Sequence, residues 1–315
     1  MKHDIPYLNL MRRIQTEGNT RGDRTGTGTI SLFGPQNEYD LRTGFFPLLT
    51  TKEVNLDSII GELLWFLSGD TNATTLILQG INIWNDWPCK YWLQQTDQTL
   101  PAQTDKAGWR QAKAEFVRLV KADPGGFGGK WGKLGPVYGK QWTKWETNRG
   151  TSINQIADLI ARLKTEKGRM CRRLIVTAWN PADIEEMAVS GLPPCHCLFQ
   201  FYVEGDTLHC KLYQRSADYV LGVPYNVACY SLLLMIVAKL TGLKPGRFIH
   251  TFGDAHLYSN HLDGPVATQL AREPRESPRL ILTDENLPSY TSFKREHFTL
   301  EGYSPDPAIR AEIAV

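Results

Sequence analysis

The 315-residue sequence has no excess of charge of either sign and no apolar run long enough to cross a bilayer. Its 35 Lys and Arg residues nearly balance 33 Asp and Glu residues, for a net charge of +2. This balance gives no global attraction to nucleic acid or acidic membranes. The longest apolar stretch, YSLLLMIVAKL, is too short and interrupted to span a membrane, and the first twenty residues lack the apolar core of a signal peptide. We therefore expect a soluble, cytoplasmic protein.

Cysteine is too sparse for a disulfide scaffold, since the chain has only six, at positions 89, 171, 195, 197, 210 and 229. Reduced thiols in a cytosolic setting are the expected state. The triplet Cys195-His196-Cys197 does not match a zinc site, because zinc ligands are usually spaced C-x2-C and no second such pair exists. We expect no metal.

The sequence also lacks the usual phosphate-binding fingerprints. The glycine-punctuated stretch DRTGTGT has neither the G-x-x-x-x-G-K-[ST] pattern of a P-loop nor a G-x-G-x-x-G before a helix. We therefore do not expect an NTPase or dinucleotide site. What remains is a loop with Arg21 and Arg24 that either approaches an anion or is simply a solvated basic loop.

Hydrophobic periodicity predicts a single α+β domain. LDSIIGELLWFLSGDTN and TSINQIADLIARLKTEKG have the spacing of amphipathic helices, and two apolar runs around Glu204-Gly205-Asp206 indicate a hairpin. YNVACYSLLLMIVAKLTG is apolar nearly all round, which is typical of a buried central helix. Residues 88–134, rich in Lys, Gln, Gly and Trp, are interpreted as an insertion at the edge of this domain. Strands around one buried helix favour the α+β class.

Cys195 is the first candidate for chemistry. Pro193 and Pro194 restrict the backbone that enters it, unlike the other cysteines, which fit the usual role of small buried hydrophobes. A thiol becomes a nucleophile near neutral pH when cations lower its pKa, and Arg215 on the neighbouring hairpin strand is a plausible source. From spacing alone, a nucleophile and a structural cysteine are about equally well supported.

Other polar residues stand in otherwise apolar sequence. Glu62 lies among apolar neighbours, where a carboxylate is costly unless it has a partner. Adjacent arginines begin the strand RRLIVTAWN, where alternation would point them to opposite faces, and His256 and Tyr258 would share a face if extended. Arginine forks match phosphate oxygens, so the set Arg24, Arg172, Arg173 and Arg215 suggests a phosphate.

Eleven segments in the same order resemble the thymidylate synthase family. They are DRTGTGTISLFG, ELLWFLSGDTN, IWNDW, LGPVYGKQW, RRLIVTAWNP, LPPCH, FQFYV, LYQRSAD, GVPYN, HTFGDAHLYSNH and the terminal AV. They cover most of the chain from residue 23 to 315 outside the insertion. The resemblance implies a large mixed, twisted β-sheet packed against the buried central helix, with residues 1–315 as the catalytic domain.

The resemblance also implies a reaction and a role for Cys195. The family reductively methylates dUMP to dTMP with 5,10-methylenetetrahydrofolate, which supplies both the carbon unit and the hydride, so no metal, flavin or nicotinamide is expected. Covalent addition of a Cys195 thiolate to C6 of uracil makes C5 nucleophilic. The side chain of Asn226 can donate to O4 and accept from N3–H, which matches uracil, whereas an aspartate would favour cytosine.

The remaining site residues follow from the same resemblance. The phosphate would be held by Arg24, Arg215 and Ser216, together with Arg172 and Arg173 reaching in from the other subunit of a homodimer. The sugar 3′-hydroxyl would be bound by His256 and Tyr258, and the proton transfers would involve Glu62, Tyr138 and His196. The folate would be held by Asp218, which binds the pterin, and by Lys52, Ile83, Trp84, Trp87, Leu192, Leu221, Gly222, Tyr225 and the terminal Ala314-Val315.

Three departures and three alternatives accompany this interpretation. Phe45-Phe46 has one aromatic more than the usual form, and the insertion at 88–134 has unfamiliar sequence. About three extra residues, Val189-Ser190-Gly191, directly precede the Leu192-to-Cys195 segment. A dUMP hydroxymethylase would use the same substrates but add water to the exocyclic methylene intermediate. Trp84 and the terminal Ala-Val favour the synthase, because they would shield that intermediate until the hydride arrives. A papain-like hydrolase would need the C-G-[SA]-C-[WY] signature, which is absent. A non-catalytic nucleotide- or RNA-binding protein would use the mildly basic 103–134 stretch, for which a solvated surface is the simpler explanation.

Overall fold

The computed structural model describes all of residues 1–315 except 23–25, 97, 103–104, 284 and 314–315. Contacts divide the chain into two compact units, which we call the large unit and the small unit. The large unit comprises Met1–Ile60, Ala157–Val176 and Cys195–Val315. The small unit comprises Gly61–Ile156 and Thr177–Pro194. Helices α2 (Leu56–Ser68) and α8 (Gln155–Leu163) and strand β6 (Ile175–Thr177) cross the boundaries between them.

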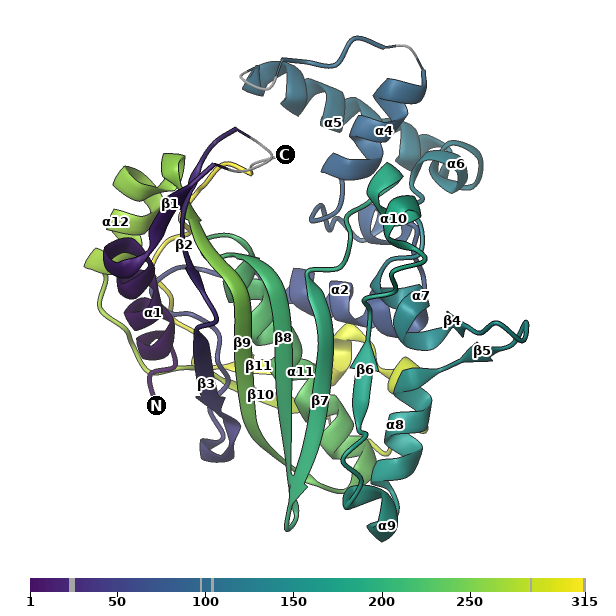
Figure 1. Cartoon of the computed structure of the whole chain (residues 1–315), viewed down its shortest axis with the longest axis vertical. Coiled ribbons are helices and arrows are strands. Elements are labelled where there is room, and N and C mark those ends of the chain that lie inside the picture. The colour runs from purple at the N-terminus through teal and green to yellow at the C-terminus, as the bar shows by residue number, and fades with distance from the viewer. Residues whose placement is uncertain (23–25, 97, 103–104, 284, 314–315) are drawn as a thin grey trace. The chain divides into compact units, whose positions relative to one another are not determined.

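The large unit is built on one mixed sheet. Within the described residues its strands follow the order β1-β2-β9-β8-β7-β6, and β3 also pairs with β9. Figure 1 shows β9, β8, β7 and β6 side by side, with α11 against the sheet. The β8–β9 pair is parallel, whereas β1–β2, β2–β9, β3–β9 and β7–β8 are antiparallel. The strands are β1 (Asn19–Arg21), β2 (Thr29–Phe33), β3 (Gln36–Asp40), β7 (His196–Glu204), β8 (Thr207–Asp218) and β9 (Lys244–Tyr258).

The predicted hairpin is present. Strands β7 and β8 meet at Glu204↔Thr207, and Gly205 between them has a φ of +60°, a conformation that favours glycine. Along β7, Phe199 and Phe201 are buried while Leu198 and Tyr202 are exposed, so successive side chains alternate between faces. The register shifts between His196 and Leu198. This bulge lies directly after Cys195, and bulges often re-aim side chains near functional sites.

The predicted central helix is α11 (Gly222–Thr241). By length and composition alone it could cross a membrane, but 72% of its most apolar window is buried inside the fold. A helix that is apolar on all sides and buried in this way is a core helix. It packs on β8 and β9 and connects them, and it ends at Gly242, whose φ of +67° is the left-handed C-cap conformation.

The rest of the large unit surrounds this core. Helix α1 (Asp4–Glu17) packs on β2, β3 and β9 through Tyr7, Leu8, Met11 and Ile14. Buried Asp4 accepts hydrogen bonds from the backbone and hydroxyl groups of Thr50 and Thr51, which satisfies its charge. The other elements are α9 (Glu166–Arg169), α12 (Ala267–Ala271), β10 (Arg279–Leu282), β11 (Phe298–Glu301) and short turns at Leu41–Thr43, Ser259–His261, Leu262–Val266, Tyr290–Ser292 and Arg295–His297.

The small unit is mainly helical. Its core in the 88–134 region contains the rings of Trp92, Phe116 and Phe127, whose centroids lie 5.5–5.8 Å apart. Its elements are α3 (Thr74–Leu78), α4 (Asp86–Gln95), α5 (Lys106–Ala122), a π turn at Pro124–Gly128, α6 (Gly129–Trp131), α7 (Tyr138–Thr143), β4 (Trp145–Glu146), β5 (Ser152–Ile153) and α10 (Ile184–Ser190). The predicted α+β class with a large mixed sheet on a buried helix is confirmed. The boundaries of the insertion stay a prediction.

Candidate active site

Cys195 lies one residue before β7, opposite Arg215 on β8. The Arg215 amide donates to the Cys195 carbonyl at 2.9 Å, and the Arg215 guanidinium lies 3.7 Å from the Cys195 sulfur. The cysteine is partly exposed, whereas Cys197, Cys210 and Cys229 are buried, as their predicted structural role requires. Burial raises the pKa of the Cys195 thiol, and the Arg215 charge lowers it by a smaller amount. Arg215 is thus the expected cation, but its charge offsets only part of the rise in the Cys195 pKa that burial causes.

His196 and Asn226 form a polar pair next to this cysteine. Burial lowers the pKa of His196 to about 4, and its hydrogen bond with the Asn226 side chain opposes that shift. The imidazole is therefore neutral at pH 7. Asn226 lies in the first turns of α11 and is partly exposed, so its amide remains accessible to a ligand. The His196 ring also packs edge-on against Tyr230, with centroids 5.2 Å apart.

Asp218 ends β8 and holds the turn into α11. Its Oδ1 accepts hydrogen bonds from the backbone N–H groups of Val220 (2.9 Å) and Leu221 (3.0 Å). The Lys52 ammonium donates a hydrogen bond to the Val220 carbonyl in the same turn at 2.5 Å. Lys52 is only 4% exposed, and burial lowers its pKa to about 8 against the opposing charge of Asp218. In this arrangement the ammonium supports the turn, so it must rearrange to reach a ligand carboxylate.

The four predicted arginines have different surroundings. Arg24 lies outside the described residues, as do Ala314 and Val315. Arg172 and Arg173 are both exposed and lie in a turn before β6, so the expectation that a strand points them to opposite faces is wrong. The cause is local: the Arg173 amide donates to the Cys171 sulfur at 3.4 Å, which closes a turn two residues before the strand begins. Both arginines are exposed, and the Arg173 side chain also hydrogen-bonds the Cys171 thiol.

His256 and Tyr258 share one face of β9, as their spacing predicts. Asp218↔His256 is a neighbouring pair of the parallel β8–β9 ladder, and Ser216↔Asp254 is another. The rings of His256 and Tyr258 are nearly perpendicular, with centroids 5.1 Å apart. The sheet register therefore brings Ser216, Asp218, His256 and Tyr258 to the carboxyl ends of two parallel strands, a common place for binding groups in α/β units.

In the small unit, Glu62 has the partner that its apolar setting requires. It lies on α2, is 8% exposed, and accepts a hydrogen bond from the Trp84 indole N–H at 2.8 Å. Burial raises the pKa of Glu62 to about 7, and the Trp84 bond opposes that rise. A carboxyl group with this pKa can both take up and release a proton near neutral pH.

Two of the predicted residues of the small unit, Trp87 and Tyr138, pack against Trp84. The Trp84 ring lies 5.4 Å from Trp87 and 6.1 Å from Tyr138, centroid to centroid. Trp87, Ile83 and Leu192 are partly exposed, so they retain apolar surface for a ligand. In the large unit, Leu221, Gly222 and Tyr225 at the start of α11 are also partly exposed.

The three extra residues before Leu192 form the end of helix α10. The Gly191 amide donates to the Met187 carbonyl at 3.1 Å, which closes the last turn. A Cβ at position 191 would lie 2.4 Å from the Leu134 carbonyl oxygen, so the backbone requires glycine there. The additional length is thereby absorbed before the Leu192-to-Cys195 segment.

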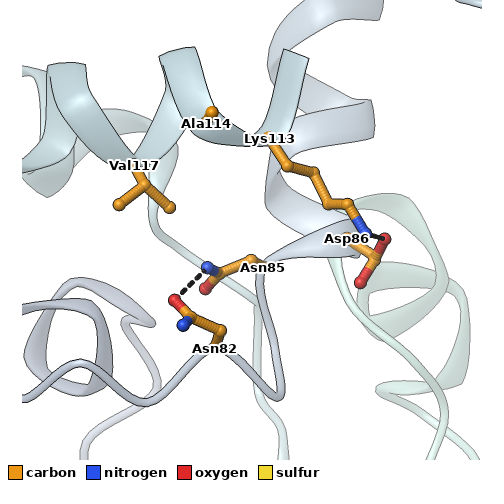
Figure 2. A pocket seen from close by; sticks show the side chains of 6 residues that line it. All are labelled: Asn82, Asn85, Asp86, Lys113, Ala114 and Val117. Atoms are coloured by element: carbon orange, nitrogen blue, oxygen red, sulfur yellow. Dashed lines mark hydrogen bonds and ion pairs between the residues drawn. The ribbon is translucent and has the colours of Figure 1, made fainter. Parts of the chain in front are cut away.

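A pocket of about 290 Å³ lies elsewhere in the small unit (Figure 2). It is lined by Asn82, Asn85, Asp86, Lys113, Ala114 and Val117. Lys113 pairs with Asp86 at 2.7 Å and the amide of Asn85 donates to Asn82 at 2.8 Å, so the polar groups largely bind one another. None of the predicted site residues lines it. Among the residues that the structure describes, no group of three or more His, Cys, Asp or Glu side chains could hold a metal ion.

Sequence reasoning missed Asp254. Its carboxylate lies 3.0 Å from His256 Nδ1 and 3.4 Å from Arg21. The available signal was its spacing: Asp254, His256 and Tyr258 alternate along one strand and thus share a face.

Comparison with known proteins matches residues 5–315 to the model of a family described as thymidylate synthase. A protein named thymidylate synthase from Listeria monocytogenes serotype 4b (strain CLIP80459) is 47% identical over 319 residues, covering 98% of this chain and 99% of the relative. One of the same name from Listeria innocua serovar 6a is 47% identical over 321 residues, with the same coverage of both. Similarity of this extent covers almost the whole chain, and the chain belongs to the thymidylate synthase family.

Proposed function

We propose that this chain catalyses the reductive methylation of dUMP to dTMP with 5,10-methylenetetrahydrofolate, using Cys195 as the nucleophile. The observation that carries the assignment of Cys195 is the guanidinium of Arg215, 3.7 Å from a partly exposed sulfur. The thiolate adds to C6 of uracil, and the electron pair of the C5–C6 double bond moves toward O4, which makes C5 nucleophilic. Folate, when bound, supplies the one-carbon unit and the hydride.

Arg215 has a specific task in this proposal. Burial disfavours the thiolate, so the proton must leave against a desolvation cost that a nearby positive charge reduces. Cys195 is held by its prolines and by the hydrogen bond from the Arg215 amide, which fixes sulfur and guanidinium relative to each other.

Asn226 orients the pyrimidine. Its amide N–H donates to O4, where negative charge develops, and its carbonyl accepts from N3–H. Neutral His196 holds Asn226 in that orientation through their side-chain hydrogen bond. This pairing selects uracil over cytosine, whose exocyclic amino group offers a donor where O4 offers an acceptor.

Glu62 handles protons for the reaction. A carboxyl group with a pKa of about 7 is present in both protonation states at neutral pH, which suits it to organise water and to move protons with Tyr138. Trp84, Trp87, Ile83, Leu192, Leu221, Gly222 and Tyr225 provide the apolar surface for folate. Asp218 accepts from the pterin, and Lys52 meets the glutamate tail after leaving Val220.

The active form is a homodimer. Leu198, Tyr202 and Tyr213 place apolar and aromatic groups on the uncovered face of the sheet, and Tyr202 is 63% exposed. Exposed apolar and aromatic side chains on one face of a sheet are typical of protein interfaces. Tyr213 and Arg215 are two apart on β8 and share this face, so a second copy lying on it reaches the neighbourhood of Cys195. Exposed Arg172 and Arg173 from that copy then bind the phosphate with Arg215, Ser216 and Arg24.

The location that fits these observations is the cytoplasm. The six cysteines are in the reduced thiol form, which is the state maintained in a reducing compartment.

The decisive experiment incubates the protein with dUMP and 5,10-methylenetetrahydrofolate and determines the mass of the nucleotide product. We expect dTMP and dihydrofolate in equal amounts. A product carrying a hydroxymethyl group would instead establish the hydroxymethylase, and no product would refute both.

The shared site is tested by mixing two inactive variants, Cys195→Ser and Arg173→Glu. If Arg173 acts in the partner's site, each mixed dimer holds one intact site, and activity returns on mixing. If mixing restores nothing although mixed dimers form, Arg173 does not act across the interface.

A further inference from the structure

Asp254 carries an interaction that none of the roles above uses. Asp254 lies on β9, two residues before His256, and is partly exposed. Its Oδ1 is 3.0 Å from His256 Nδ1. Its other oxygen, Oδ2, is 3.4 Å from the Arg21 guanidinium. The carboxylate therefore connects the β1 end to the His256 imidazole, which is itself buried.

The contacts of Asp254 with Arg21 and with His256 differ in strength. Arg21 is 62% exposed and its contact with Asp254 is long, and exposed ion pairs of this kind contribute little to stability. The contact to His256 is shorter and joins a buried ring, so it is less screened by solvent. The principal consequence of Asp254 is thus its effect on His256.

That effect is the choice of tautomer. An ionised carboxylate can only accept hydrogen bonds, so the hydrogen must reside on His256 Nδ1. In the neutral ring, Nε2 then carries a bare lone pair and can only accept. Nε2 has no hydrogen-bond partner among the described residues, so it is available to a ligand that donates.

We infer that Asp254 is a positioning residue for nucleotide recognition, which fixes His256 as the Nδ1–H tautomer so that Nε2 accepts a hydrogen bond from the 3′-hydroxyl of the substrate sugar. The inference rests on the proposed function. It adds a specificity rule: the sugar must present a donor at the 3′ position. Carboxylates that orient histidines through Nδ1 act in the same way in metal sites and catalytic triads.

Arg21 makes Asp254→Asn an informative variant. A guanidinium can only donate, so the asparagine orientation that keeps the Arg21 contact turns the amide oxygen toward Arg21. The amide NH₂ then faces His256 Nδ1 and donates to it, which favours the hydrogen on Nε2. The variant should therefore reverse the tautomer with almost no change in side-chain shape.

The first test compares dUMP with 2′,3′-dideoxyuridine 5′-monophosphate in the wild type and in Asp254→Asn. We expect the KM for dUMP to rise about tenfold, as for the loss of one good hydrogen bond, with kcat within threefold. The KM for the dideoxy analogue should change less than twofold, because that ligand never makes the bond. Glu38→Gln, an acid paired with Arg247 at the other end of β9, is the matched control and should change neither.

The second test observes the tautomer directly by long-range ¹H–¹⁵N NMR of ¹⁵N-histidine-labelled protein. The chain has seven histidines, and His256→Gln identifies the signal of interest. We expect Nδ1–H in the wild type and Nε2–H in Asp254→Asn. An Nε2–H wild type, or an equal rise in KM for both nucleotides, overturns the inference. Absence of dTMP formation by the wild type refutes the proposed function instead, and the NMR spectrum of the wild type decides the tautomer even if the variant fails to fold.

Discussion

Replacing Trp84 by phenylalanine is expected to raise the pKa of Glu62. The indole N–H donates to Glu62 Oε1 at 2.8 Å and lowers a pKa that burial has raised to about 7. A hydrogen bond to a charged group contributes about 1.5–3 kcal/mol, and one pKa unit corresponds to about 1.4 kcal/mol. Loss of the bond should therefore raise the pKa of Glu62 by about one to two units, into the range of about 8–9. Phenylalanine preserves most of the apolar contact with Phe66 and Tyr138.

The measurement is a pH titration of ¹³C-carboxyl-labelled glutamate by NMR, with Glu62→Gln used to identify the Glu62 signal. Trp87→Phe is the matched control, since its ring lies 5.4 Å from Trp84 and its removal leaves the Trp84–Glu62 bond intact. At pH 7.5, Glu62 should be mainly ionised in the wild type and mainly protonated in Trp84→Phe. An unchanged or lowered pKa in Trp84→Phe, or an equal rise in Trp87→Phe, would refute this account of the carboxyl group.

Three further outcomes are expected. Because folding raises the pKa of Glu62 from 4.5 to about 7, the stability that its neutral form contributes is complete below pH 4.5 and is lost as the pH rises to about 7. Glu62→Gln cannot ionise and should escape this loss. In urea unfolding, the free energy of unfolding of the variant should therefore rise by about 3 kcal/mol relative to that of the wild type between pH 4.5 and pH 8. Arg215→Met should raise the pKa of Cys195 further, so that iodoacetamide alkylates Cys195 more slowly at pH 8, while a rate equal to the wild type would show that the guanidinium does not act on the sulfur. Asn226→Asp should lose most turnover of dUMP and bind dCMP more tightly relative to dUMP, as measured by competition; an unchanged preference would remove Asn226 from base recognition.

Local patterns predicted the central elements of the large unit. The apolar stretch around residues 222–241 is the buried helix α11, and the Glu204–Asp206 signal is the turn between β7 and β8. These two predictions were correct because the sequence pattern and the structure that it indicates lie within the same short segment. Cys195 was identified by its prolines, and Glu62 by its apolar surroundings, both of which are sequence neighbours.

Features that depend on distant residues were not accessible in the same way. The buried position of Lys52 arises from the Val220 carbonyl, 168 residues away. The turn at Arg172 and Arg173 depends on where the strand actually begins, and strand boundaries are poorly defined by local sequence. The role of Asp254 requires the direction of the His256 ring, which only the three-dimensional arrangement gives.

The small unit holds the whole 88–134 segment, whereas β7, β8, α11 and β9 form a nearly continuous stretch of the large unit from residue 196 to 258. Evolution can thus lengthen or shorten the helical region around α5 without shifting the strand register that aligns Arg215, Asp218 and His256. The same separation offers a route for protein engineering, in which peptide tags or sensor modules inserted near α5 leave the β8–β9 ladder untouched.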